Sequence, residues 1–299
     1  MHPTDTKTDP DWLEGQYNNR ALVPAHQAHF DRWASHSARA RQDLPCLLDL
    51  AYGFGPGETL DVFPAQGRKG GGLAPVMVFI HGGYWRSLDK ADHSFVAAAF
   101  ARRGVCVVVP NYALCPAVTI PDICLQMVRA TAWVYRHIGV HGGDPRRIMV
   151  AGHSAGGHLA AMMLSARWQE VAADLPPSLL HSALSISGLF DLEPLRHTPF
   201  LSDSLRLTPE QVRLASPVGF AAPPLVPEGR GVRGALACVA GADESAEFLR
   251  QNGLLRQVWG DRAVPVCEAL PGLNHFSVLE AFTDPRHRLH RLAMKWLLA

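Results

Sequence analysis

A serine between glycines occupies the middle of the sequence, in Gly152-His153-Ser154-Ala155-Gly156. The run Ile148–Ala151 before it predicts a strand, and the segment Gly157–Ser165 after it predicts a helix. A serine at such a strand-to-helix turn is typical of a nucleophile elbow, where small neighbours leave room for a strained backbone. A chance turn of small residues is the alternative. The motif therefore predicts a serine nucleophile only if partners for Ser154 occur elsewhere in the chain.

A glycine-rich turn, His81-Gly82-Gly83-Tyr84-Trp85, directly follows the apolar run Val76–Ile80, which predicts a buried strand. Backbone N–H groups in such a turn can point at a developing oxyanion with no side chain in the way. Gly82 and Gly83, together with Ala155, are therefore the predicted oxyanion donors. His81 is interpreted as a brace for this turn, and Tyr84 and Trp85 are predicted pocket walls.

The two motifs, each at the end of a predicted strand, resemble those of the α/β-hydrolase fold, where serine, acid and histidine follow in that chain order. His275 is the histidine that lies between the last predicted strand, Val264–Ala269, and the predicted closing helix. It is therefore the predicted base. Asp243 and Glu244 follow the predicted strand Ala235–Ala240, and either carboxylate is placed to orient the imidazole. The other would be a solvated loop charge or a helix N-cap.

The elements that position these residues alternate between short apolar runs and amphipathic, helix-length segments. This pattern predicts an α/β fold with a mostly parallel central sheet, helices on both of its faces and a small cap region. Residues 1–299 are expected to form a single domain, with an N-terminal segment at 1–45 and a cap or surface excursion at 189–232. Further strands are predicted at Val105–Pro110, Ala183–Ser187 and, as an antiparallel edge, Glu58–Phe63; helices are predicted at Ala91–Arg103, around Ile123–Ile138 and at Pro285–Leu298.

Composition excludes several classes of protein. The 28 Lys and Arg residues nearly balance the 27 Asp and Glu residues, so neither nucleic acid nor an anionic membrane is an expected partner. The polar start lacks the pattern of a signal peptide, and no apolar run is long enough to span a membrane. The six cysteines are scattered without metal-binding or redox spacing. They favour a cytoplasmic location, and no metal site is expected.

The chain is similar to the kynurenine formamidase (arylformamidase) group of the hormone-sensitive-lipase-like esterases. The resemblance rests on the two glycine-rich motifs, on Asn274-His275-Phe276, on Tyr17-Asn18-Asn19-Arg20 and on Glu244-Ser245-Ala246-Glu247-Phe248, and it covers nearly the whole chain. The family's aspartate aligns with Glu244, so the resemblance favours Glu244 as the acid. Glutamate serves in other triads of this fold, although its longer side chain must approach the imidazole differently, which keeps Asp243 as the alternative.

The resemblance implies a serine hydrolase that cleaves an aryl formamide such as N-formylkynurenine to formate and the arylamine, without a cofactor. A general short-chain carboxylesterase is the alternative within the same chemistry. A catalytically silent scaffold used for binding is a third hypothesis, weakened because every triad role has a candidate. The expected partner is a small-molecule substrate, and a homodimer is left open.

Overall fold

A sheet of eight strands runs through the molecule, in the order β1-β2-β4-β3-β5-β6-β9-β10. The structure is a computed structural model that describes residues 8–67, 71–228 and 231–299. Pairing is antiparallel between β1 and β2 and between β2 and β4, and parallel across the rest of the sheet. The strands are β1 Leu47–Ala51, β2 Thr59–Phe63, β3 Ala74–Ile80, β4 Cys106–Pro110, β5 Gly143–His153, β6 Leu180–Ile186, β9 Ala235–Gly241 and β10 Val266–Leu270, while β7 Val226–Glu228 and β8 Gly231–Arg233 form a separate hairpin.

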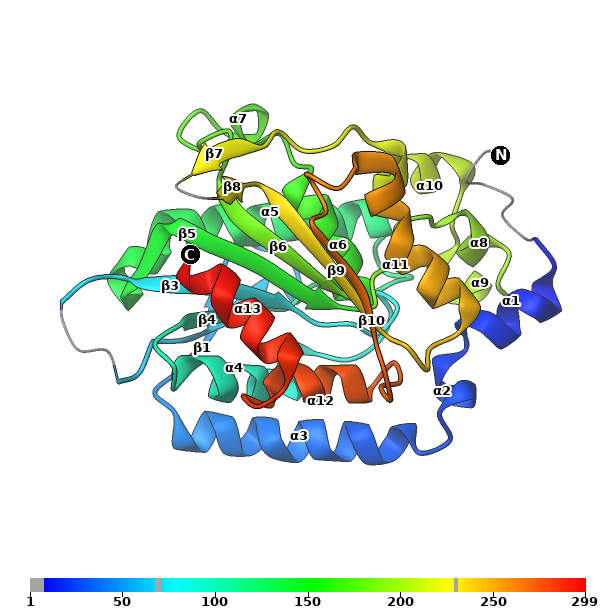
Figure 1. Ribbon diagram of the computed structural model, residues 1–299, viewed down its shortest axis with the longest axis horizontal. Coiled ribbons are helices and arrows are strands. Elements are labelled where there is room, and N and C mark those ends of the chain that lie inside the picture. The colour runs from blue at the N-terminus through cyan, green and yellow to red at the C-terminus, as the bar shows by residue number, and fades with distance from the viewer. Residues whose placement is uncertain (1–7, 68–70, 229–230) are drawn as a thin grey trace.

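Helices cover both faces of this sheet (Figure 1). They are α1 Pro10–Tyr17, α2 Asn19–Leu22, α3 His26–Asp43, α4 Ser94–Ala101, α5 Ile120–His137, α6 Ala155–Leu164, α7 Trp168–Val171, α8 Glu193–Arg196, α9 Pro199–Leu205, α10 Pro209–Ala215, α11 Ala246–Trp259, α12 Ser277–Thr283 and α13 Arg288–Leu298, with short 3-10 helices η1 Lys90–Asp92, η2 Ile138–His141 and η3 Pro217–Gly219.

Strand β3 shows how the sheet separates two hydrophobic cores. Val76, Val78 and Ile80 belong to the core beneath α5, α6 and α11, whereas Met77 and Phe79 belong to the core beneath α3, α4, α12 and α13. The alternation follows from the two-residue period of a strand. Because both faces are covered, β3 is buried along its whole length. This explains why its sequence is a continuous apolar run.

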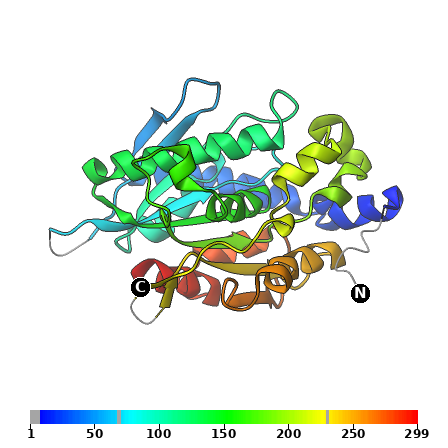
Figure 2. The same ribbon diagram turned by 90° about the horizontal axis from the view of Figure 1, so that it is seen from above.

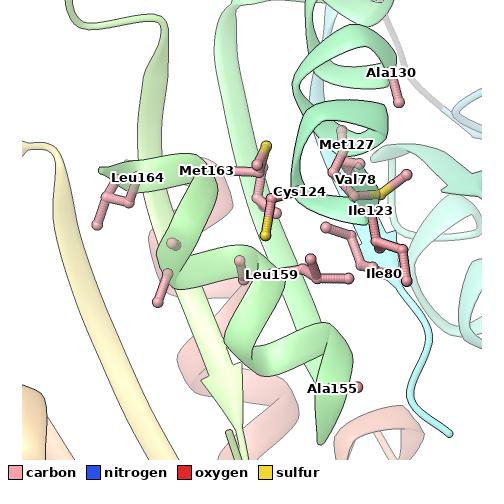
Figure 3. Close-up of a cluster of buried hydrophobic side chains, with 14 of the residues drawn as sticks. Val78, Ile80, Ile123, Cys124, Met127, Ala130, Ala155, Leu159, Met163 and Leu164 are labelled. Carbon is pink, nitrogen blue, oxygen red and sulfur yellow. The ribbon is translucent and has the colours of Figure 1, made fainter. Parts of the chain in front are cut away.

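Helix α6 packs on the sheet beside α5, as Figure 3 shows, with Leu159 and Met163 among the side chains in this cluster. Neighbouring α5 begins at a capping box, in which Thr119 and Asp122 each accept a hydrogen bond from the other's backbone N–H. Its buried residues include Ile123, Met127 and Ala130, as expected from their spacing. The start of α6 at the end of β5 is thereby held by packing on two sides.

The α/β fold and the predicted core strands are confirmed, with shifted ends. The predicted strand Glu58–Phe63 is also present and antiparallel, as β2, but its predicted place at the edge of the sheet is wrong. Strand β2 pairs with β4 on one side and with β1 on the other, so β1 forms the edge. Because β1 is almost entirely exposed, its sequence shows no burial pattern. The predicted helix Ala91–Arg103 is split into η1 and α4, because Asp89 caps η1 separately. The closing helix begins only at Arg288, after α12, which the sequence pattern does not predict.

Segment 189–232 contains α8, α9, α10, η3, β7 and the start of β8, and its helices α8 and α9 lie beside α1, as both views show (Figures 1 and 2). Helix α1 packs against α9 and α11. The Tyr17 hydroxyl donates a hydrogen bond of 2.8 Å to Glu247 Oε2 and accepts one of 3.1 Å from Gln251 Nε2. The N-terminal segment, of which residues 1–7 lie outside the described residues, is thus tied to this region. Among the described residues, no helix combines the length and apolar character needed to cross a membrane.

Candidate active site

Ser154 stands in a sharp turn between β5 and α6. Its backbone has φ 56° and ψ −119°, a conformation that costs an L-residue about 1–3 kcal/mol and persists only where neighbours impose it. One such constraint is the hydrogen bond of 2.8 Å from the Ser154 N–H to the carbonyl of Ile186. A second is close packing, because a Cβ on Gly156 would overlap the carbonyl of Ile80. The serine is held at the N-terminus of a helix with 3 % of its surface exposed.

His275 lies on the loop after β10 and contacts Glu244. Glu244 Oε2 is 2.7 Å from His275 Nδ1, and the two side chains are 0 % and 4 % exposed. The other carboxylate oxygen, Oε1, accepts hydrogen bonds from the Gly241 N–H at 2.7 Å and from the Ser187 hydroxyl at 2.6 Å. Asp243 is exposed, and its backbone N–H donates to the carbonyl of Leu273. The structure therefore brings Glu244, and not Asp243, to the imidazole.

His153 is a second histidine at the site, and nothing in the sequence selects it beyond its place inside the serine motif. Its Nε2 is 2.7 Å from the carbonyl of His275, and the two rings are 4.7 Å apart. Burial, and then the neighbouring His275, lower the pKa of His153 well below its usual value. A neutral imidazole with its proton on Nε2 satisfies this geometry. His153 thus fixes the backbone of the loop that carries His275.

The glycine-rich turn lies beside Ser154, since a Cβ added to Gly82 would come 3.2 Å from the Ser154 Cβ. The N–H groups of Gly82 and Gly83 have no hydrogen-bond acceptor within the described ranges 8–67, 71–228 and 231–299. Ala155 is the first residue of α6, so its N–H has no acceptor inside the helix. Three backbone donors are therefore available around one serine.

The side chain of His81 supports this turn from within the core. It is fully buried, stacks on Tyr112 at 4.2 Å and has its Nε2 3.1 Å from Asn111 Oδ1. Burial lowers the pKa of His81, which favours the neutral ring. These contacts agree with the interpretation of His81 as a brace.

A cavity of about 250 Å³ opens over Ser154 and His275. Tyr84 lines it, and its hydroxyl donates a hydrogen bond of 2.6 Å to the carbonyl of Tyr17. Trp85 does not line it, which corrects the expectation. The Trp85 ring is fully buried and packs edge-on against His158 at 5.0 Å. Successive positive φ angles of 51° and 55° at these two residues send one ring to the cavity and the next to the core.

The remaining walls come from several distant parts of the chain. Asn18, Asn19 and Arg20 contribute from the N-terminal segment, Phe30 and Trp33 from α3, and Phe200 from α9; Arg86, Ser87, Leu88, His153 and Phe276 complete the lining with Gly83. Within the described residues, no three His, Cys, Asp or Glu side chains gather as metal ligands would. The only sequence signal for the N-terminal wall is the family resemblance of Tyr17-Asn18-Asn19-Arg20.

Residues 60–183 match the family model BD-FAE. The chain is 28 % identical to a kynurenine formamidase of Danio rerio over 295 residues, covering 96 % of each protein. It is 30 % identical to esterase LipC of Mycobacterium tuberculosis over 79 % of this chain and 61 % of that protein. A Silicibacter protein described as a thioesterase superposes with a TM-score of 0.79 at 29 % identity, over 94 % of this chain and 98 % of that one. These similarities place the chain among the hydrolases, and the fold among those of the esterases.

Proposed function

We propose that this chain, an α/β-hydrolase of the hormone-sensitive-lipase-like branch, hydrolyses an aryl formamide such as N-formylkynurenine. The observation that carries the proposal is that Ser154 and His275 line one small cavity while Glu244 holds the far nitrogen of the imidazole at 2.7 Å. Similarity to a kynurenine formamidase along 96 % of the chain supports the substrate class. The expected partner is thus a small molecule.

In the proposed reaction, Ser154 Oγ attacks the formyl carbon as His275 Nε2 takes its proton. The N–H groups of Gly82, Gly83 and Ala155 hold the oxyanion of the tetrahedral intermediate. His275 then protonates the departing nitrogen, which leaves as the arylamine, and the formyl group remains as an ester on Ser154. Water, deprotonated by His275, attacks this ester. His275 then returns the proton to Ser154 Oγ as the ester bond breaks and formate leaves. Every step uses groups of this chain, so the proposal includes no metal or cofactor.

A general short-chain carboxylesterase is the second candidate, because the same serine chemistry cleaves esters. It is supported by the 30 % identity to esterase LipC. The two candidates differ in the leaving group: an arylamine is expelled only when it is protonated, whereas an alkoxide or phenoxide leaves more readily. The proton held by His275 therefore matters more for the formamide.

The proposed reaction does not depend on the oligomeric state or on the cellular location of the protein. All the groups named above belong to one copy of the chain, so a homodimer is compatible with the reaction but not required. Free thiols at all six cysteines accord with the proposed cytoplasmic location.

The acyl chain is expected to be short. A formyl carbon bears only hydrogen, and a cavity of about 250 Å³ must also hold the leaving group. Each methylene that the site rejects is worth about 1–3 kcal/mol of discrimination. We expect kcat/KM to fall from formyl and acetyl to butyryl and octanoyl substrates, and N-formylkynurenine to be hydrolysed at least as efficiently as a simple acetyl ester.

Initial rates on N-formylkynurenine and on a series of p-nitrophenyl esters, measured with the same purified protein, test this expectation. Preference for octanoyl esters would contradict the short acyl site. Turnover of esters with an inert N-formylkynurenine would replace the formamidase by the general esterase.

A further inference from the structure

The cavity over Ser154 carries positive charge. Arg20 and Arg86 line it, and no Asp or Glu side chain is among its lining residues, all of which belong to the described part of the chain. The Arg86 guanidinium already has hydrogen-bond partners in the protein: its Nη1 donates to the carbonyl of Phe200 at 2.6 Å and to Ser204 Oγ at 2.9 Å. It thereby joins the glycine-rich turn to α9.

The Arg20 guanidinium does not make hydrogen bonds of this kind with any described residue. Its guanidinium lies over the ring of Phe30, 5.4 Å from the ring centre, and makes no hydrogen bond or ion pair with any residue of the described ranges. Arg20 is exposed, and the cation–π contact favours a position at the cavity wall without neutralising its charge. An unpaired arginine at a cavity wall presents donors in the fork geometry that matches a carboxylate.

The charges near Arg20 and Arg86 also favour an anionic ligand in the cavity. Burial and then the charge of Arg20 lower the pKa of Arg86, so the two cations oppose each other. Glu14 favours the Arg86 cation but does not line the cavity. Its two oxygens accept hydrogen bonds from Asn18 Nδ2 at 2.9 Å and from the Phe200 N–H at 3.0 Å. An anionic ligand would relieve the repulsion that Glu14 only partly offsets.

We propose that this cavity selects substrates whose leaving group carries a carboxylate, and that Arg20 binds that carboxylate. The inference rests on the proposed function for the reacting acyl group, and it adds the recognition of the other half of the substrate. Because no acidic side chain of residues 8–67, 71–228 or 231–299 lines the cavity, an ammonium group on the leaving group is not recognised. The carboxylate alone carries the selectivity.

Three formamides that share one reacting group test the proposal. N-formylkynurenine carries both an ammonium and a carboxylate, 4-(2-formamidophenyl)-4-oxobutanoate carries only the carboxylate, and 2-formamidoacetophenone carries neither. We expect the two carboxylates to be hydrolysed with similar kcat/KM, about tenfold above the neutral ketone, through a lower KM. In 0.5 M NaCl this preference should shrink, because exposed charges are screened.

Arg20→Gln should abolish most of the preference by raising KM for the carboxylates, and Arg20→Lys should retain part of it. Arg167→Gln is the matched control, since Arg167 is 80 % exposed in an ion pair with Glu170 and does not line the cavity; it should keep the wild-type ratio. An unchanged ratio in Arg20→Gln would overturn the proposal, as would a neutral ketone hydrolysed as well as the carboxylates by the wild type.

A second pair of substrates separates failure of the anion site from failure of the proposed formamidase activity. If no formamide is hydrolysed, the same ratio is measured with the acetyl ester of 3-(4-hydroxyphenyl)propanoate and with the methyl ester of that compound. A preference for the free carboxylate that depends on Arg20 would uphold the anion site in a general esterase. Equal rates on the pair would overturn it.

Discussion

Replacing Ser154 with alanine should lower kcat by about 10⁴-fold or more, because residues of a triad act as a unit and the nucleophile begins the reaction. The thermal midpoint should stay within about 2 °C of wild type, since a small side chain replaces another in the same turn. The hydrogen bond that holds the turn comes from the Ser154 backbone N–H and survives the substitution.

The loss is expected to be this large because, in the part of the chain that the structure describes, no other hydroxyl at the cavity is equally placed. Ser87 also lines the cavity, but its hydroxyl donates to the carbonyl of Gly83 at 3.0 Å. It stands on the turn after β3 and not at the N-terminus of α6. A residual rate would come from the backbone donors and from substrate binding.

Ser165→Ala provides the matched control, because Ser165 lies at the other end of α6 and donates to the carbonyl of Ala161 at 3.1 Å. Activity on N-formylkynurenine and on a p-nitrophenyl acetyl ester is measured for both variants, together with thermal unfolding. The control should keep its kcat within about twofold, as an ordinary partly exposed substitution does. Wild-type turnover by a folded Ser154→Ala protein would remove Ser154 from the mechanism.

The parts of the site that could be predicted from the sequence lie directly at the ends of core strands. β3 and β9 are buried throughout, β5 is buried from Ile148 onward, and each contains a continuous apolar run. Gly82, Ser154 and Glu244 are therefore each fixed within a few residues of a strand end. In a parallel sheet these ends meet at one edge. Local pattern and topology are therefore enough to gather these residues.

Contacts across long sequence separations could not be predicted in this way. Arg20 and Phe200 meet at the same cavity because α1 docks on α9. The sequence pattern of neither segment indicates that it contacts the other. Ser187 ends a predicted strand, yet its bond to Glu244 depends on a backbone with φ 53°. The burial of Trp85 depends likewise on a local turn, which the residue types alone do not determine.

The choice between the two acids shows the limit most clearly, since Asp243 and Glu244 are adjacent. The deciding quantity is the direction of each side chain from the loop, which the bond from the Gly241 N–H to Glu244 Oε1 helps to set. From the residues alone, either carboxylate satisfies the role. A longer side chain is accommodated here because Ser187 and Gly241 both hold its far oxygen.

Glu244→Gln should therefore lower kcat far more than Asp243→Asn does. The glutamine oxygen can still accept from Gly241 and Ser187, which leaves its NH₂ group facing His275 Nδ1. That nitrogen must then act as an acceptor, which moves the imidazole proton to Nε2 and prevents His275 from taking the proton of Ser154. In a serine protease triad, a wrong tautomer of this kind lowers kcat by about 10⁴-fold.

Asp243→Asn is the matched control because it removes one carboxylate charge from the neighbouring position. Its side chain is exposed, so kcat should stay within about twofold of wild type. Saturating rates and thermal midpoints of both variants separate lost chemistry from lost folding. Glu244→Gln should keep a KM close to that of wild type, because Glu244 does not line the cavity. A larger loss of kcat in Asp243→Asn would instead assign the acid to Asp243, and the loop would then have to rearrange when substrate binds, since Glu244 occupies that place in this structure.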